Sequence, residues 1–370
     1  MMWQRIWSLV IKELLAVWRD KKSRMVLIIP PMAQLIIFSF AATLDVKNAS
    51  IAILNHDSGK VSTDLIQQFV GSPTFASIVY LQGVEQIRPT IDQQRAMMVL
   101  HIDESFSRQL YAGKPASVQL ILDGRKSNTT QIVAGYATEI INQFSDAFAK
   151  ERGFPVQSAR LIVRNWYNPN LIYLWFNVPN LVGILTMVVS LIITALSVAR
   201  ERELGTFDQL LVSPMEPFEI VVGKTLPAVI ISLGEATLIL GVAIGLYQIP
   251  FLGSLWVLYV SLIVFVFAVV GVGLFLSSIC KTQQQAILAS FVFMSPALLL
   301  SGYATPIENM PVWLQKIDLI NPIRYFLVIT KGVFLKGMPF SIAWELIWPM
   351  AVIAFFNLLG ANWMFRRRLE

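Results

Sequence analysis

The chain has 370 residues, of which 55% are hydrophobic and only 14% are charged, and its formal net charge is +6. Soluble domains carry about 25% charged residues, so this composition is typical of a membrane protein. The basic residues lie beside apolar runs, so the positive charge does not indicate a nucleic-acid partner. The sequence contains one cysteine, Cys280, and two histidines, His56 and His101. It therefore offers neither an internal disulfide nor a cysteine- or histidine-rich metal site.

The first segment, residues 1–24, has the spacing of an amphipathic helix. Apolar side chains recur at three- and four-residue intervals, among them Trp3, Trp7, Leu14 and Trp18. With tryptophans at the margin of the apolar face, such a helix can lie along the surface of a membrane. It can equally pack against the protein's own spans, and the sequence leaves both possibilities open.

Six apolar runs are long enough to be membrane spans, which need about 20 residues. They cover residues 25–44, 171–199, 225–247, 255–279, 286–302 and 341–365. Basic residues precede the first run, flank the loop at 200–224 and form the tail at 366–370. Because short basic flanks favour the cytoplasm, we predict that both termini are cytoplasmic. The first run is longer than the core of a signal peptide, about 7–15 residues, which favours a retained span over a cleaved one.

Residues 45–170, between the first two runs, are the region able to fold in water. Short strand patterns at 50–57, 77–81, 96–102 and 117–124 alternate with helical patterns, and a long helical pattern covers 128–150. This alternation predicts a small α/β domain outside the membrane. His56 and His101 lie at the ends of strand patterns, where we expect turn or surface roles rather than metal ligation.

The loop at 200–224 has the signals of a short helix held between two stops. Gly205 can end the preceding helix in the left-handed conformation, and Thr206 can cap a new helix. Pro214 stops that helix after about two turns. Its apolar face would consist of Phe207, Leu210 and Leu211. On these signals and the topology alone, an ordinary surface loop between two spans is the favoured interpretation, and the short helix is the alternative.

The segment at 303–340 is external in the predicted topology, yet it is apolar and interrupted by prolines. We expect short helices or a re-entrant hairpin, which is tolerated at membrane depth where it packs against protein. The residues that characterise it are Pro306, Pro311, Trp313, Asn321, Pro322 and Tyr325.

Two of these stretches resemble one protein family. "ARERELGTFDQLLVSPMEPFEIVVGK" (199–224) and "SGYATPIENMPVWLQKIDLINPIRY" (301–325) are similar to the matching segments of type-2 ABC exporter permeases. The layout resembles the multidrug-type variant with a large external domain between the first two spans. The resemblance implies a polytopic α-helical membrane protein with six transmembrane helices and an inserted α/β periplasmic domain.

The resemblance also implies roles for the loop and the first segment. Residues 206–213 would be a coupling helix in a groove of a separate ATPase subunit, and residues 1–24 a cytoplasmic connecting helix. The coupling set would be Glu201, Arg202, Glu203, Gly205, Thr206, Phe207, Asp208, Leu210, Leu211 and Pro214. Its charged members would contact the ATPase, its apolar members would insert into the groove, and Gly205 and Pro214 would fix its shape.

The chain itself carries no phosphate-binding loop. "GKT" (223–225) echoes the end of such a loop, but Phe218 stands where a glycine is required, and Thr225 opens an apolar span. We therefore expect a non-catalytic permease that binds no cofactor, with ATP and Mg²⁺ on two copies of the ATPase subunit. The other expected partners are a second permease copy or a sister permease, and a periplasmic adaptor protein. The bacterial inner membrane is the expected location.

Glu235 is the one acidic residue deep within an apolar run, about 16 Å along a helix from Lys224. Carboxylates at that depth usually face a cavity or a partner, so Glu235 is a candidate for the transport pathway of a hydrophobic or amphiphilic substrate. A protonated carboxyl that joins helices near Ser232 or Thr237 is the alternative. For the whole chain, the alternative function is a membrane-anchored sensor or surface-assembly factor that uses the external domain.

Overall fold

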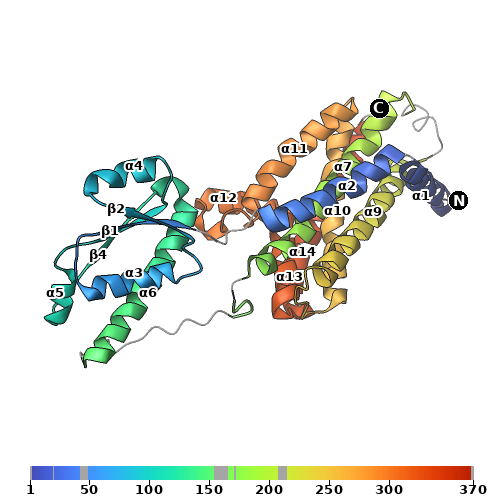
Figure 1. Cartoon of the computed structure of the whole chain (residues 1–370). Coiled ribbons are helices and arrows are strands. Elements are labelled where there is room, and N and C mark those ends of the chain that lie inside the picture. The colour runs from blue at the N-terminus through green and yellow to red at the C-terminus, as the bar shows by residue number, and fades with distance from the viewer. Residues whose placement is uncertain are drawn as a thin grey trace. The chain divides into compact units, whose positions relative to one another are not determined.

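The computed structural model describes residues 2–19, 21–41, 49–153, 166–170, 172–206 and 215–367. The chain divides into two compact units. Leu44–Arg164 form one, here called the α/β unit, and Met1–Thr43 with Asn165–Glu370 form the other, here called the helical unit. Figure 1 shows the elements of both units.

The α/β unit is built on a four-stranded sheet with the order β2-β1-β3-β4. The strands are β1 (Ser50–Asn55), β2 (Ser77–Leu81), β3 (Met98–Ile102) and β4 (Val118–Leu122). β1 pairs in parallel with β2 and with β3, whereas β4 is antiparallel to β3. The four residues in the middle of β1 are all buried, as expected of a central strand covered on both faces.

Helices cover both faces of this sheet. The α-helices are α3 (Lys60–Val70), α4 (Ile87–Asp92), α5 (Phe106–Tyr111) and α6 (Ser127–Arg152), with 3-10 turns η1 (Val84–Gln86) and η2 (Gly124–Lys126). One apolar cluster joins the sheet to α3, α5 and α6, and a smaller one joins the other face to α4. Strands and helices thus alternate in this unit, and its placement outside the membrane stays a prediction.

The two histidines meet at the ends of β1 and β3. His101 Nε2 lies 3.3 Å from His56 Nδ1, and His101 Nδ1 lies 3.3 Å from Gln119 Oε1. Among the described residues, no group of three or more side chains could hold a metal ion.

The helical unit contains seven helices of 18 or more residues within the described ranges. They are α1 (Met2–Arg19), α2 (Lys21–Ala41), α7 (Tyr173–Glu203), α9 (Pro217–Gly245), α10 (Leu255–Ile279), α11 (Gln283–Leu300) and α14 (Phe340–Arg367). Five of the described helices, namely α7, α9, α10, α11 and α14, are long and apolar enough to cross a membrane. The apolar part of α2, Ile28–Phe40, is shorter. A sixth span at 25–44 therefore stays a prediction, and residues 42–48 lie outside the described ranges.

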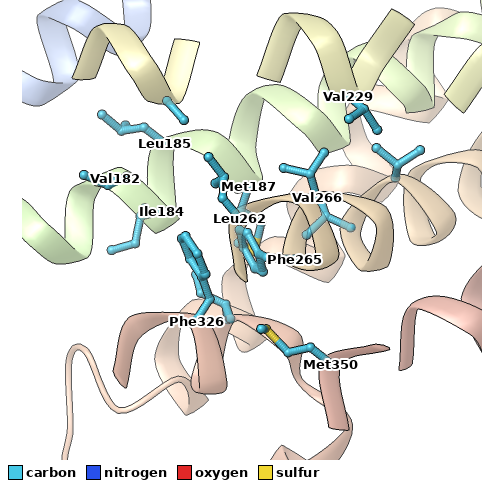
Figure 2. Packing of buried hydrophobic residues seen from close by; sticks show 14 of the residues in the cluster. Val182, Ile184, Leu185, Met187, Val229, Leu262, Phe265, Val266, Phe326 and Met350 are labelled. Carbon is cyan, nitrogen blue, oxygen red and sulfur yellow. The ribbon is translucent and has the colours of Figure 1, made fainter. Parts of the chain in front are cut away.

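The core of the helical unit lies between α7, α9, α10, α14 and the shorter helix α13 (Pro322–Lys336), as Figure 2 shows. The rings of Phe265 on α10 and Phe326 on α13 stack with centroids 4.4 Å apart. Gly183 on α7 allows this approach, because a Cβ atom there would lie 2.9 Å from the Phe326 ring. Small residues commonly serve this purpose in membrane helices, whose backbones pack closely.

Hydrogen bonds between helices define two ends of the helical unit. At one end, Arg202 of α7 donates to the Ser278 carbonyl of α10, and Glu203 accepts from the Gln283 amide of α11. At the other end, Asn177 of α7 donates to the Phe38 carbonyl of α2 and accepts from the Tyr303 hydroxyl. We call the first the Lys224 end and the second the Asp318 end, after the buried charged residue that lies at each.

Candidate functional site

The C-terminus of α7 has the geometry of a helix that ends in a defined corner. Gly205 is left-handed, with a φ of 70°. The Thr206 amide donates to the Glu201 carbonyl at 2.9 Å and the Gly205 amide to the Arg202 carbonyl at 3.1 Å, which together form a Schellman motif. Gly205 thus ends the helix in the way its sequence position predicts, and the chain leaves α7 in a fixed direction.

The expected coupling helix follows this corner directly. Residues 207–214, with Phe207, Asp208, Leu210, Leu211 and Pro214, lie outside the described residues, so that prediction stays open. The description resumes at Met215, and α9 begins at Pro217. The side chain of Glu216 caps α9 and that of Glu219 bonds back to the Glu216 amide, which completes a capping box.

Lys224 is the centre of a charged cluster that joins three helices at this end. Its side chain is fully buried, and its Nζ lies 3.0 Å from Glu13 Oε1 on α1 and 2.8 Å from Glu201 Oε2 on α7. The same nitrogen donates to the Ser197 hydroxyl of α7 at 3.1 Å. Removal of one partner from a buried ion pair costs about 3–5 kcal/mol, because the remaining charge is left uncompensated. Lys224 therefore holds α1, α7 and α9 together.

Two further ion pairs extend the cluster along α1. Lys12 Nζ lies 3.1 Å from Glu201 Oε1, and Arg5 lies 3.8 Å from Glu219 Oε2 on α9. In both pairs the cation is exposed and the carboxylate is buried, so each cation is less costly to remove than the fully buried Lys224. Glu201 was expected to offer its charge to a partner subunit, yet both of its oxygens are directed into this cluster.

Arg202 and Glu203, predicted as contacts for a partner, also bind within the chain. Arg202 donates to the carbonyls of Ser278 and Cys280 at 2.7 and 3.1 Å. Glu203 Oε2 accepts from the Gln283 amide at 2.8 Å. The last turn of α7 is thereby tied to the connection between α10 and α11, so a displacement of α7 would carry that connection with it.

The helix α1 packs on α9 through an apolar face. Ile6, Leu9 and Val10 are buried. Gly223 of α9 allows the contact, because a Cβ atom there would lie 2.6 Å from the Leu9 side chain. Leu9 is buried at this contact because Gly223 leaves room for its side chain.

The opposite margin of α1 remains exposed. Trp3, Trp7 and Trp18 are 71%, 60% and 70% exposed, and Leu14 is half-buried. Both sequence interpretations of α1 thus have a physical counterpart: one face packs on the protein, and the tryptophans are free to enter an interface with lipid headgroups.

Glu235 lies within α9 and lacks the partners that the sequence suggested. Neither carboxylate oxygen has a hydrogen-bond partner in the described part of the chain, and both are buried. Ser232 bonds instead to Ser190 at 2.7 Å, and Thr237 to Tyr259 at 2.8 Å. The alternative in which Ser232 or Thr237 holds a protonated Glu235 is therefore not formed here.

At the Asp318 end, the segment between α11 and α14 folds as short helices. Pro306 and Pro311 precede η3 (Ile307–Asn309) and α12 (Val312–Ile317), and Pro322 occupies the first turn of α13, where its missing N–H costs nothing. Trp313 is 62% exposed. The Tyr325 hydroxyl donates to the Leu319 carbonyl at 2.9 Å.

A second charged cluster fixes this segment, and its centre is Asp318, which is not among the residues predicted from the sequence. Asn321 donates to Asp318 Oδ1 at 2.9 Å and to the Ala297 carbonyl of α11 at 2.8 Å, and Arg324 lies 3.2 Å from Asp318 Oδ2. Burial raises the pKa of Asp318, and the Asn321 hydrogen bond and the Arg324 charge oppose that shift. The sequence does contain a signal for this cluster, because an acidic residue, Asp318, and a basic residue, Arg324, lie six positions apart in an otherwise apolar segment.

Within the described ranges, five helices are long and apolar enough to cross a membrane, which is typical of a multi-pass membrane protein. Residues 21–362 match the family model described as ABC-2 family transporter protein. The chain belongs to the ABC-2 transporter family, and it is a membrane-embedded permease.

Three curated relatives from Escherichia coli K12 each match at least 96% of the chain. It is 46% identical over 368 residues to the Escherichia coli K12 protein named "Probable multidrug ABC transporter permease YbhR", with 100% of each chain covered. It is 28% identical to "Probable multidrug ABC transporter permease YbhS" of the same strain, over 100% of this chain and 98% of that one. It is also 28% identical to "Inner membrane transport permease YhhJ", with 96% of each covered.

Proposed function

We propose that this permease couples ATP hydrolysis by a separate ATPase subunit to the export of hydrophobic or amphiphilic compounds across a bacterial inner membrane. The names of two of these relatives, a probable multidrug permease and an inner membrane transport permease, support a multidrug substrate range and an inner-membrane location. ATP and Mg²⁺ would bind to the ATPase subunit, two copies of which would serve one transporter, while the permease performs no catalysis.

The observation that carries this proposal is the Lys224 cluster. Residues 207–214 connect α7 to α9, and Lys224 joins those two helices to each other and to α1. A force applied to the connecting segment by a docked ATPase would therefore move three helices as one body. Gly205 and the Schellman motif give that segment a fixed point of attachment.

The proposed topology places the Lys224 end at the cytoplasmic face. Its support is the concentration of basic residues there, from the N-terminal helix to Arg366 and Arg367 at the end of α14. With α2 as a sixth span, both termini are cytoplasmic, and the α/β unit lies in the periplasm, where it could meet an adaptor protein.

A second permease copy, or a sister permease, would complete the pathway. The helix α11 exposes large apolar side chains along its length, including Leu288, Val292 and Leu299, which are 66%, 68% and 58% exposed. Six spans are few for a complete pathway, so a paired arrangement that covers part of this surface is favoured.

Glu235 is the proposed polar contact inside the pathway. Its buried carboxylate has no hydrogen-bond partner in the described part of the chain, which leaves it available to a cationic group of a substrate. The Glu235→Gln variant should lose export of cationic compounds and retain export of neutral ones, measured as dye efflux from cells. Unchanged export of both kinds would remove Glu235 from the pathway.

The coupling proposal is tested by co-purification of the ATPase subunit with the tagged permease. The Phe207→Asp, Leu211→Asp double variant should recover at least about tenfold less ATPase than the wild type, a difference of about 1.4 kcal/mol in binding. The matched control is Val312→Asp with Ile320→Asp, two exposed apolar positions at the Asp318 end. Equal recovery by all three proteins would exclude docking through residues 207–214.

A further inference from the structure

Two lysines of α13 lie over aromatic rings at, or just before, the start of α7. Lys331 Nζ is 5.5 Å from the centroid of the Phe176 ring on α7, and Lys336 Nζ is 5.2 Å from the centroid of the Tyr167 ring that precedes α7. Both distances are within the range of about 6 Å at which a cation is attracted to the face of an aromatic ring. A ring carries no net charge, so these contacts leave both positive charges in place.

No carboxylate in the described part of the chain neutralises these two lysines. Arg324, on the same helix, pairs with Asp318, whereas neither Lys331 nor Lys336 has an acidic partner among the described residues. Lys331 is half-buried, and burial lowers its pKa. The charge of Lys336 lowers that pKa further, and Glu308 opposes the shift. Two interacting positive charges in such a setting are stabilised by a nearby anion.

Aromatic side chains place the two lysines at the level of lipid headgroups. Trp166 is 77% exposed and its ring lies 6.2 Å from that of Tyr167, while Trp344, close to the start of α14, is 52% exposed. Exposed tryptophans and tyrosines at the ends of membrane helices mark the headgroup region. Val328, about one turn before Lys331 on α13, is 41% exposed, so this face of α13 is also open to an acyl chain.

We propose that Lys331 and Lys336 bind the phosphate of an acidic phospholipid, such as phosphatidylglycerol, in the leaflet at the Asp318 end. Each ammonium group donates to phosphate oxygens of the headgroup. A zwitterionic phospholipid carries an amine cation of its own, which the two lysines repel, so the acidic lipid is preferred. The inference requires only that the chain lies in a bilayer, as its family shows, and does not rest on the proposed export.

The test is native mass spectrometry of the purified full-length permease after equilibration with vesicles of equal phosphatidylglycerol and phosphatidylethanolamine. Each lysine should favour the acidic lipid by about fivefold, so the wild type should retain phosphatidylglycerol with a preference of about 25-fold. Lys331→Gln and Lys336→Gln should each lower this preference about fivefold, and the double variant should retain the two lipids nearly equally. Because Lys336 is exposed, its single variant should fold as the wild type does.

Two control variants separate the loss of this site from a change in net charge and from misfolding. Lys281→Gln with Lys316→Gln removes two exposed lysines, one at each end of the helical unit, and should keep the wild-type preference. Lys331→Arg with Lys336→Arg changes the shape of both side chains but retains both charges, so it should keep most of the preference.

Three results would overturn the proposal. The first is equal retention of the two lipids by the wild type. The second is a loss of preference in the Lys281, Lys316 control as large as that in the Lys331, Lys336 glutamine variant, which would assign the preference to net charge alone. The third is displacement of the retained lipid by inorganic phosphate at an equal concentration, which would make the two lysines a site for a soluble anion.

Discussion

The two ends of the helical unit each hold a buried ion pair, but the two pairs differ in what they join. Lys224 and Glu13 are 211 residues apart in the sequence, and Glu201 lies on a third helix. Asp318 and Arg324 are six residues apart, and their cluster bonds to the Gln315 carbonyl of the same segment and to the Ala297 carbonyl of α11. The first arrangement links separate elements, whereas the second shapes a single segment. Transmission of motion between helices requires contacts between separate helices, as at Lys224. A segment that closes one end of a bundle needs mainly contacts within itself, as at Asp318.

The largest expected effect on the free energy of unfolding comes from a change in the Lys224 cluster. Lys224→Met should destabilise the permease by about 3–5 kcal/mol, because Glu13 and Glu201 would remain close together and partly buried without the Lys224 charge that neutralises both. Thermal unfolding of the purified protein, followed by tryptophan fluorescence, measures the loss. The control is Lys281→Met, at an exposed lysine on the same end. An unchanged unfolding temperature would show that Lys224 does not hold the three helices together.

A smaller effect is expected where α1 packs on α9. Gly223→Val places a side chain against Leu9 and should cost about 1–3 kcal/mol through overpacking. The visible result should be faster cleavage of α1 by a protease. Gly234→Val is a matched control on the same helix, since a Cβ atom there meets nothing within 4 Å. Equal cleavage of the two variants would contradict the observed contact.

The comparison also predicts a local defect at the Asp318 end. Asn321→Leu removes the bonds to Asp318 and Ala297 and should cost about 1–3 kcal/mol, the penalty for buried groups left unpaired. Hydrogen exchange should then rise in residues 312–336 and stay unchanged in α1. Increased exchange in α1 would mean that the two ends are not independent.

The smallest effect concerns pH. Because burial raises the pKa of Asp318 in the folded protein, the folded state holds its proton more tightly than the unfolded state does. The contribution of Asp318 to stability is therefore greatest below its unfolded pKa, falls as the pH rises toward the folded pKa, and is constant above that value. Asp318→Asn should flatten the dependence of the unfolding temperature on pH in that window. An equal slope in wild type and variant would assign the dependence to another group.

The sequence predicts those features of the fold that depend on neighbouring residues. The apolar run at 255–279 coincides with α10, since a long run of this kind is sufficient to form a spanning helix. The left-handed Gly205 follows from a glycine placed after the last helical residue. The charged clusters could not be derived in this way. From the sequence, Glu201 would be a surface residue beside Arg202 and Glu203. It becomes a buried partner of Lys224 only because α1 and α9 pack around it.

The central claim is that the Lys224 cluster passes motion from the ATPase subunit to the membrane helices. The most direct measurement is dye export by Lys224→Met permease reconstituted with its ATPase in proteoliposomes, compared with ATP hydrolysis by the same vesicles. We predict that the ATPase still binds and hydrolyses ATP, while export per ATP falls at least about tenfold, equivalent to about 1.4 kcal/mol of lost coupling. Export per ATP equal to that of Lys281→Met would contradict the claim.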